Sequence, residues 1–190
     1  FAWAIGELAA KVGMSVLFPA LANIHRTDPE RLKSVFARTR QPLIIVSLFG
    51  FLVLSYLAPW LVDVLYDDRY QEMGIYLMLA AINGGLGIIT MFYNHALLAC
   101  GDSKANFMIS IISAISRIGF MVLGFYVADV IGMLLGLGLG IMVVYPVIAW
   151  YASARKILLL GSDILFYILF LVSAWIILLQ SGFFSLKWVS

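Results

Sequence analysis

The chain has 190 residues, of which 64% are hydrophobic and only 12% are charged, with a formal net charge of +2. Soluble domains are about half apolar and about a quarter charged, so a soluble shell could not cover this much apolar surface and lipid must be the solvent. The small net charge gives no indication of a nucleic-acid partner, and the single cysteine, Cys100, excludes an internal disulfide and a cysteine-rich metal site.

Six segments are long and apolar enough to cross a membrane, which takes about 20 residues. In chain order they are 1–24, 42–64, 74–99, 105–128, 130–151 and 163–180. They predict an all-α fold, a polytopic transmembrane helical bundle of about six spans, because β-barrel strands would show ten-residue alternation. The chain starts Phe-Ala-Trp and ends soon after Lys187. We therefore expect it to be a piece of a longer protein.

Three connections carry most of the positive charge. Eight of the 12 Lys and Arg residues lie in 25–41, 100–105 and 152–162, whereas the opposite side holds Arg69 and Lys187. Lys and Arg are retained on the cytoplasmic side of a membrane. The three connections are therefore predicted to be cytoplasmic, and the first span to run from outside to inside.

The long connection 25–41 has a helix signal of its own. Thr27 and Asp28 precede Pro29, and Glu30 follows, as at a helix N-terminus. Downstream, an apolar face is formed by Leu32, Val35 and Phe36. We predict a short helix lying on the inner membrane surface. A solvated basic connector is the alternative, because the apolar face is small.

Polar side chains line up at helical spacing in three of the spans. The first span presents Glu7, Lys11 and Ser15; the third presents Asn83, Gly87, Thr90 and Asn94; the fourth presents Asn106, Ser110, Ser113, Arg117 and Gly124. Polar residues within spans usually face the bundle interior or a watery cavity. These seams are therefore expected if the three helices surround an aqueous cavity.

Each seam also has a structural explanation. Serine, threonine and asparagine often form hydrogen bonds between packed membrane helices. Glu7 and Lys11 are four residues apart and can form an ion pair, and we favour this interpretation over one in which Glu7 carries protons. Arg117 has no carboxylate near it on its own helix. Its partner must be Glu7, lipid phosphate, water or a ligand.

The fifth span contains a small-residue stripe. Gly132, Gly136 and Gly140 repeat every four residues and predict a flat face for close helix packing. Pro146 predicts a kink in the same span.

Catalytic and cofactor motifs are absent from the sequence. There is no cluster with metal-ligand spacing, no phosphate-binding glycine loop and no assembled Ser–His–Asp set. We expect neither an enzyme nor a bound cofactor or metal.

The order of elements resembles that in the second half of polysaccharide-repeat-unit flippases of the Wzx type. The stretches that carry the resemblance are LFPAL (17–21), DPERLKSVFAR (28–38), VLYDDRYQEMG (64–74), LLACGDSKAN (97–106) and FYVADVIGMLLGLGLG (125–140). It covers about residues 1–160 as a pattern of elements. The chain departs from the family at Asp67 and at Ala128-Asp129, where glycine is usual.

The resemblance implies membership of the multidrug, oligosaccharidyl-lipid and polysaccharide exporter superfamily. This chain would form most of one lobe of a two-lobe, inverted-V transporter, with the missing N-terminal half as the other lobe. The cargo would be an oligosaccharide on a polyprenyl pyrophosphate, flipped from the inner to the outer leaflet of a bacterial or archaeal cytoplasmic membrane. Arg117 matches the family only as a cation in an inward seam.

Arginine suits the phosphate of such a cargo because its planar fork donates paired, charge-assisted hydrogen bonds. The candidate substrate-binding residues are Arg117, Ser113, Ser110, Asn83, Asn94, Glu7 and Lys11. Two alternatives remain: lipid II or drug export within the same superfamily, and a non-transporting membrane scaffold subunit with dry, packed seams.

Overall fold

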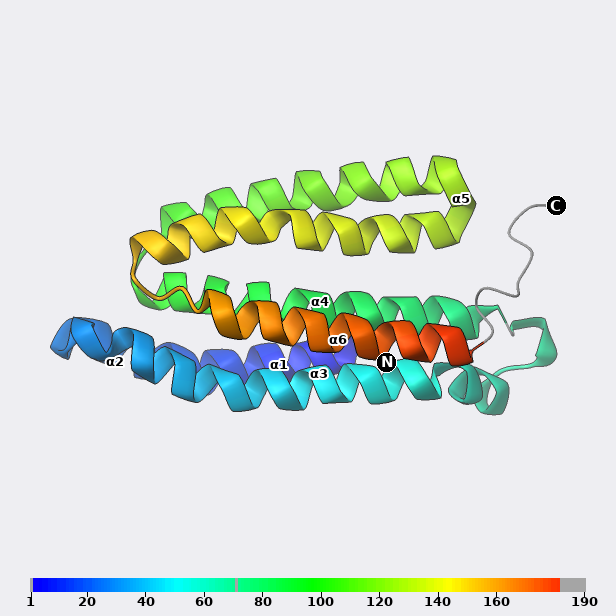
Figure 1. The fold of residues 1–190 in the computed structure, drawn as a ribbon, viewed down its shortest axis with the longest axis horizontal. Helices are drawn as coiled ribbons and strands as arrows, with labels where there is room; N and C mark the ends of the chain where they lie inside the picture. Colours follow the sequence, from blue (N-terminus) through cyan, green and yellow to red (C-terminus); the bar gives the residue numbers. More distant parts are fainter. Residues whose placement is uncertain (1, 71, 182–190) are drawn as a thin grey trace.

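The computed structural model describes residues 2–70 and 72–181, which form helices and their connections without a strand (Figure 1). The elements, with two 3-10 turns and one π-helical turn among them, are α1 (Ala2–Val12), η1 (Gly13–Leu17), α2 (Phe18–Thr27), η2 (Pro29–Arg31), α3 (Leu32–Leu65), η3 (Asp68–Tyr70), α4 (Met73–Ala99), α5 (Ser103–Ala154) and α6 (Leu160–Gln180). The predicted all-α class is confirmed.

Five helical segments are long and apolar enough to span a membrane, and the longest of them consists of two helices joined at a kink. At about 1.5 Å per residue, the 52 residues of α5 would extend about 78 Å, far beyond a hydrocarbon core of about 30 Å. The chain reverses at Ala128 and Asp129, whose backbone angles are not helical. Figure 1 shows the two halves of α5 side by side. The described residues therefore hold six helical segments of spanning length, in agreement with a multi-pass membrane protein.

The glycine stripe closes this hairpin. A Cβ atom on Gly136 would overlap the carbonyl oxygen of Phe120, and one on Gly140 would lie 2.8 Å from the Cα atom of Arg117. Gly132 and Gly124 meet in the same way nearer the turn. The predicted close packing at Gly136 is thus confirmed, and its partner is the preceding half of α5.

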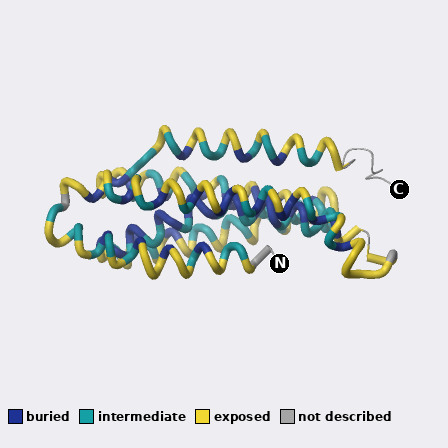
Figure 2. Tube along the Cα trace, turned by 90° about the horizontal axis from the view of Figure 1, so that it is seen from below, coloured by how far each residue is buried: buried dark blue, intermediate teal, exposed yellow. Residues whose placement is uncertain are grey.

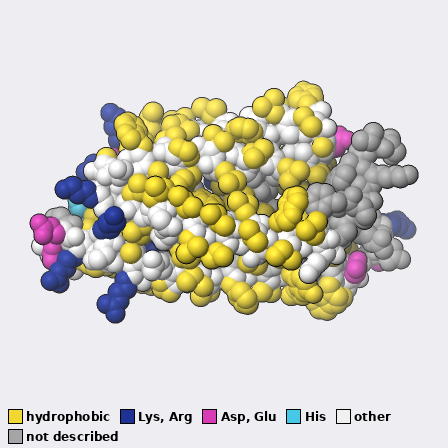
Figure 3. Space-filling model, viewed as in Figure 1, with side chains coloured by type: hydrophobic (Ala, Val, Ile, Leu, Met, Phe, Trp, Pro, Cys, Tyr) yellow, Lys and Arg dark blue, Asp and Glu magenta, His cyan; other side chains and the backbone are white. Residues whose placement is uncertain are grey.

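Helix α4 is the centre of the bundle. It contacts α1, α2, α3, α5 and α6, and most of its residues are buried. Figure 2 shows the buried residues along the middle of the bundle and the exposed ones on its outer faces. The outer faces are largely apolar (Figure 3), as expected for helices in contact with lipid.

The three basic connections lie at one end of the bundle. In Figure 1, the junctions α2–α3, α4–α5 and α5–α6 are at the same end, and in Figure 3 most of the visible Lys and Arg gather there. This arrangement is the one expected from six alternating spans.

The structure differs from expectation in the connection 25–41. Instead of a separate surface helix, residues 32–65 form the single helix α3, which begins about ten residues earlier than the predicted span. Leu32 and Phe36 are buried in the bundle core. Their apolar face therefore packs against protein rather than against the membrane surface, and Pro42 is accommodated within the helix.

Candidate functional site

The predicted pair in the first span is present on the surface of the bundle. Lys11 Nζ lies 3.9 Å from Glu7 Oε2, and the two side chains are 78% and 54% exposed. Both residues lie on α1, which packs against α3 and α4. The pair therefore faces away from the part of the bundle that the structure describes.

The seam of the third span is partly used for packing. Asn83 donates from Nδ2 to the carbonyl oxygen of Leu134 at 2.8 Å and so joins α4 to α5. Thr90 donates to the carbonyl oxygen of Gly87 in its own helix at 2.8 Å. In contrast, Asn94 has a buried Oδ1 atom without a hydrogen-bond donor in the described chain. Asn83 thus has the structural role, and Asn94 remains a candidate ligand.

Arg117 lies on the first half of α5, where its backbone packs against Gly140. The side chain is half-buried, and its Nε atom is buried without a hydrogen-bond acceptor. No carboxylate of the described residues forms an ion pair with it, and Glu7 pairs with Lys11 instead. Glu7 is therefore excluded as the partner of Arg117 in this structure.

The serines of this seam do not complete a closed site around Arg117. Ser110 is exposed and donates to the carbonyl oxygen of Asn106 at 2.8 Å, and Ser113 is half-buried. Within the described residues, no hydrogen bond or ion pair joins the seams of α1, α4 and α5 to one another. The predicted residues thus form separate groups in this chain.

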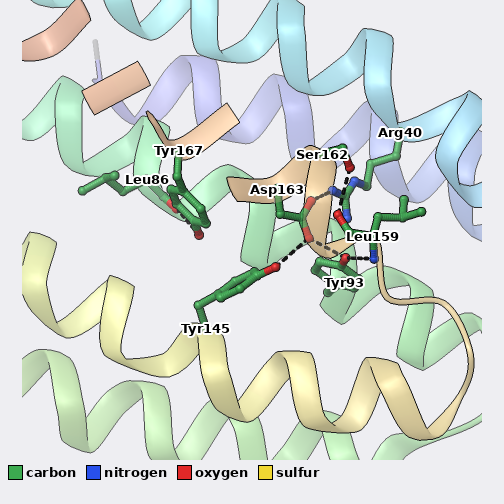
Figure 4. A network of polar contacts seen from close by, with 8 residues as sticks. All are labelled: Arg40, Leu86, Tyr93, Tyr145, Leu159, Ser162, Asp163 and Tyr167. Carbon is green, nitrogen blue, oxygen red and sulfur yellow. Dashed lines mark hydrogen bonds and ion pairs between the residues drawn. The ribbon is translucent and has the colours of Figure 1, made fainter. Parts of the chain in front are cut away.

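The strongest polar cluster is one that the sequence did not predict (Figure 4). Asp163, in the first turn of α6, forms an ion pair with Arg40 of α3, and both side chains are 0% exposed. The other carboxylate oxygen, Oδ2, accepts hydrogen bonds from Tyr93 of α4 at 2.6 Å and from Tyr145 of α5 at 2.8 Å. One carboxylate therefore joins four helices.

Aromatic rings hold the guanidinium of Arg40 in place. Its Cζ atom lies 4.6 Å from the ring centroid of Tyr93 and 5.0 Å from that of Phe36. Cation–π contacts of this kind are strongest when the cation is removed from water. Asp163 also gains from its position, because the positive end of a helix dipole favours a carboxylate in the first turn.

The cluster extends into the connection before α6. The hydroxyl of Tyr93 accepts a hydrogen bond from the backbone N–H of Leu159 at 2.9 Å, and Ser162 donates to the carbonyl oxygen of Leu159 at the same distance. Asp163 therefore has a charged partner and two hydroxyl donors within the protein. A carboxylate with these partners has little capacity left for a ligand, and removing its charged partner would leave a buried charge uncompensated.

Sequence reasoning assigned Arg40 to the basic connection and placed Asp163 at the start of the sixth span. The signal that could have found the pair is that Asp163 is the only acidic residue after Asp129. A single carboxylate at the start of a span requires a partner, because burying an unpaired charge is costly. The identity of that partner depends on which helices are neighbours, which the sequence alone does not give.

An ion pair between Asp102 and Arg155 joins the two ends of α5 at the basic end of the bundle. Arg155 donates from Nε and Nη2 to Oδ2 of Asp102 at 3.0 and 2.7 Å, and the backbone N–H of Ala105 donates to Oδ1 at 3.1 Å. These contacts, led by the hydrogen bonds from Arg155, hold the pKa of the Asp102 carboxyl below its usual value. Asp102 thus caps the start of α5 and binds its far end.

The fold and these polar groups define a helical, multi-pass membrane protein with a buried charge cluster near its basic end and a mid-span arginine. Across residues 2–70 and 72–181, no group of three His, Cys, Asp or Glu side chains could hold a metal ion. No family model, curated protein or solved structure matches the chain.

Proposed function

We propose that this chain is most of one lobe of a membrane transporter that flips a polyprenyl-pyrophosphate-linked oligosaccharide from the inner to the outer leaflet by alternating access. The protein moves its cargo without altering it chemically. The observation that carries the proposal is the position of Arg117, a cation in the middle of a span with no anionic partner among the described residues.

The depth of Arg117 makes it unsuited to a purely surface role. It lies 11 residues beyond Asn106, which corresponds to about 16 Å along the helix, near the middle of a core about 30 Å thick. An arginine at the centre of a bilayer costs at least about 2.5 kcal/mol if it is left in lipid. A phosphate-bearing cargo that passes this level would offset that cost through paired hydrogen bonds to the guanidinium.

The exposed pair on α1 supports the same proposal. Glu7 and Lys11 neutralise each other but remain largely exposed on a helix that is apolar enough to span the membrane. Charged side chains at membrane depth usually face protein or water rather than lipid. This face of α1 is therefore assigned to the cavity between the present lobe and the N-terminal half.

The test uses the full-length protein in cells that depend on it to export a lipid-linked sugar. Arg117→Ala should leave the amount of folded protein near that of the wild type and reduce export at least about tenfold. Arg117→Lys should retain part of the activity, because the charge remains but the planar fork is lost. Ile118→Ala, which shortens an exposed apolar side chain on the neighbouring position, is the control and should export normally.

Normal export by Arg117→Ala would refute the role of Arg117 as a cargo ligand. If Arg117→Ala does not fold, Arg117→Gln provides the second measurement, since it keeps a polar side chain of similar reach. Export by Arg117→Gln at the wild-type rate would refute the proposal in the same way. Loss of assembly of a larger complex, with lipid flipping unchanged, would favour the scaffold alternative.

A further inference from the structure

A recess opens at the basic end of the bundle, between the start of α3 and the start of α6. Its volume is about 750 Å³, and it is lined by Lys33 and Gln41 from α3, Ser153 and Lys156 from the end of α5 and the turn after it, and the segment 158–162. The walls come from elements more than 100 residues apart in the sequence. The recess is distinct from the Arg117 seam, which lies on the first half of α5.

The charged side chains that line the recess are both lysines. Lys33 and Lys156 are both exposed, and neither forms an ion pair within the described residues. Two acidic groups at this end of the bundle are engaged elsewhere: Asp163 binds Arg40, and Asp28 binds Arg31 at 3.0 Å. Glu30 lines a neighbouring recess together with Lys156, but the two do not form an ion pair.

The start of α6 supplies hydrogen-bond donors for an anion in addition to the two lysines. No side chain caps this end of the helix, and Leu160, Gly161 and Ser162 of its first turn line the recess. Gly161 has open space where a Cβ atom would be. The first backbone N–H groups of a helix lack partners in the helix, so they add favourable interactions with an anion that the lysines attract.

The buried ion pair fixes the two walls at a constant separation. Arg40 directly precedes Gln41 on the α3 wall, and Asp163 directly follows Ser162 on the α6 wall. Because Arg40 and Asp163 are bound to each other without access to solvent, the lysine side and the helix-start side are held in register. The recess is therefore preorganised for an anion.

An apolar track runs from this recess along α6. Leu160, at the rim, is followed at intervals of four residues by Ile164, Ile168 and Val172, all of which are exposed. Residues with this spacing lie on one face of a helix. A ligand with a phosphate head and acyl chains would fit the recess and the track together, whereas free phosphate would use only the recess.

We propose that this recess binds the phosphate headgroup of an anionic phospholipid of the leaflet that contacts the basic end, with an acyl chain along Leu160, Ile164 and Ile168. Basic pockets between membrane helices bind such headgroups by the same electrostatics. The site is independent of the proposed transport function, because none of its residues belongs to the Arg117 seam.

The test uses native mass spectrometry of the purified full-length protein, which is released from nanodiscs that contain phosphatidylglycerol and phosphatidylcholine. The measured quantity is the phosphatidylglycerol that stays bound to the released protein. Lys33→Gln and Lys156→Gln should each lower retention about fivefold, because one basic residue near an anionic headgroup contributes about 1 kcal/mol. The control is Lys104→Gln, an exposed lysine at the same end that does not line the recess, and it should change retention less than about twofold.

Gly161→Glu tests the recess with both lysines intact. A glutamate in the first turn favours the helix, so the protein should fold while the new carboxylate repels the headgroup and lowers retention. Equal losses for Lys33→Gln and Lys104→Gln would refute the site, because they would show diffuse surface attraction. Displacement of the lipid by millimolar inorganic phosphate, or equal retention of phosphatidylcholine, would refute the assignment to an anionic lipid.

Discussion

Breaking the buried ion pair between Arg40 and Asp163 should destabilise this bundle more than breaking any other ion pair of the described residues. Asp163→Asn keeps the volume of the side chain and an oxygen that can accept from Tyr93 and Tyr145, but it leaves the guanidinium of Arg40 without an anion. Arg40→Gln leaves the carboxylate with the two tyrosine donors alone. The double variant is neutral and keeps hydrogen-bonding groups on both sides.

The magnitude follows from complete burial. Both side chains are 0% exposed, so removing one partner leaves an uncompensated buried charge, which costs about 3–5 kcal/mol. We expect a loss of this size for Asp163→Asn and a smaller loss for Arg40→Gln, because Asp163 retains hydrogen bonds of 2.6 and 2.8 Å. The double variant should be less destabilised than Asp163→Asn, with a coupling free energy of about 2–3 kcal/mol.

The assay is equilibrium unfolding of the purified protein in mixed micelles, followed by tryptophan fluorescence during titration with a denaturing detergent. A parallel cycle with Glu7→Gln and Lys11→Gln is the control, since exposed pairs four residues apart in a helix contribute only about 0.3–0.5 kcal/mol. Additive losses at Arg40 and Asp163, or couplings of equal size in the two cycles, would refute the role assigned to burial.

Three further predictions follow, two from contacts in the structure and one from the distribution of Lys and Arg. Gly136→Leu should lower the amount of folded protein in membranes because it forces the halves of α5 apart, whereas Gly119→Leu, where a Cβ atom meets nothing within 4 Å, should accumulate normally; equal accumulation of the two would contradict the hairpin. The pKa of Asp102 is lowered in the folded state, so the stability that its ionised form contributes is present at neutral pH and is lost as the pH falls below about 4. Asp102→Asn should remove this acid-dependent loss of stability, and a variant with the same pH dependence of unfolding as the wild type would refute the role of Asp102. Ser34→Cys should react with a membrane-impermeant maleimide only after cells are permeabilised, and labelling of intact cells would reverse the topology.

Much of the fold was predictable because length and hydropathy are local properties. The all-α class and the reversal of α5 at Ala128–Asp129 follow from runs of about 20 apolar residues and from the charge between two of them. The contact between Gly136 and Phe120 was predictable in kind, since small residues every four positions mark a close helix approach. Its partner could not be named before the neighbouring helix was known.

The error at 25–41 has a physical cause. The basic residues of 25–41 predict a connection outside the membrane, so the predicted span begins at residue 42. A helix that extends beyond the hydrocarbon core keeps its apolar face against other helices, and here Leu32 and Phe36 find that contact in the bundle core. The local sequence pattern predicted the helix but could not predict which surface its apolar face would pack against.

Asp163 and Arg117 show why the candidate site was only partly predictable. Both are charges at membrane-spanning helices, and the sequence gives no local partner for either. The structure supplies Asp163 with Arg40, Tyr93 and Tyr145 from three other helices, so that its charge is satisfied within the chain. The backbone of Arg117 packs against Gly140, but its side chain has no anionic partner in the described part of the chain. A charge that folding satisfies belongs to the architecture, whereas a charge that folding positions and leaves unpaired must be satisfied by something else. That difference in the three-dimensional arrangement is the physical reason for proposing a ligand role for Arg117 and a structural role for Asp163.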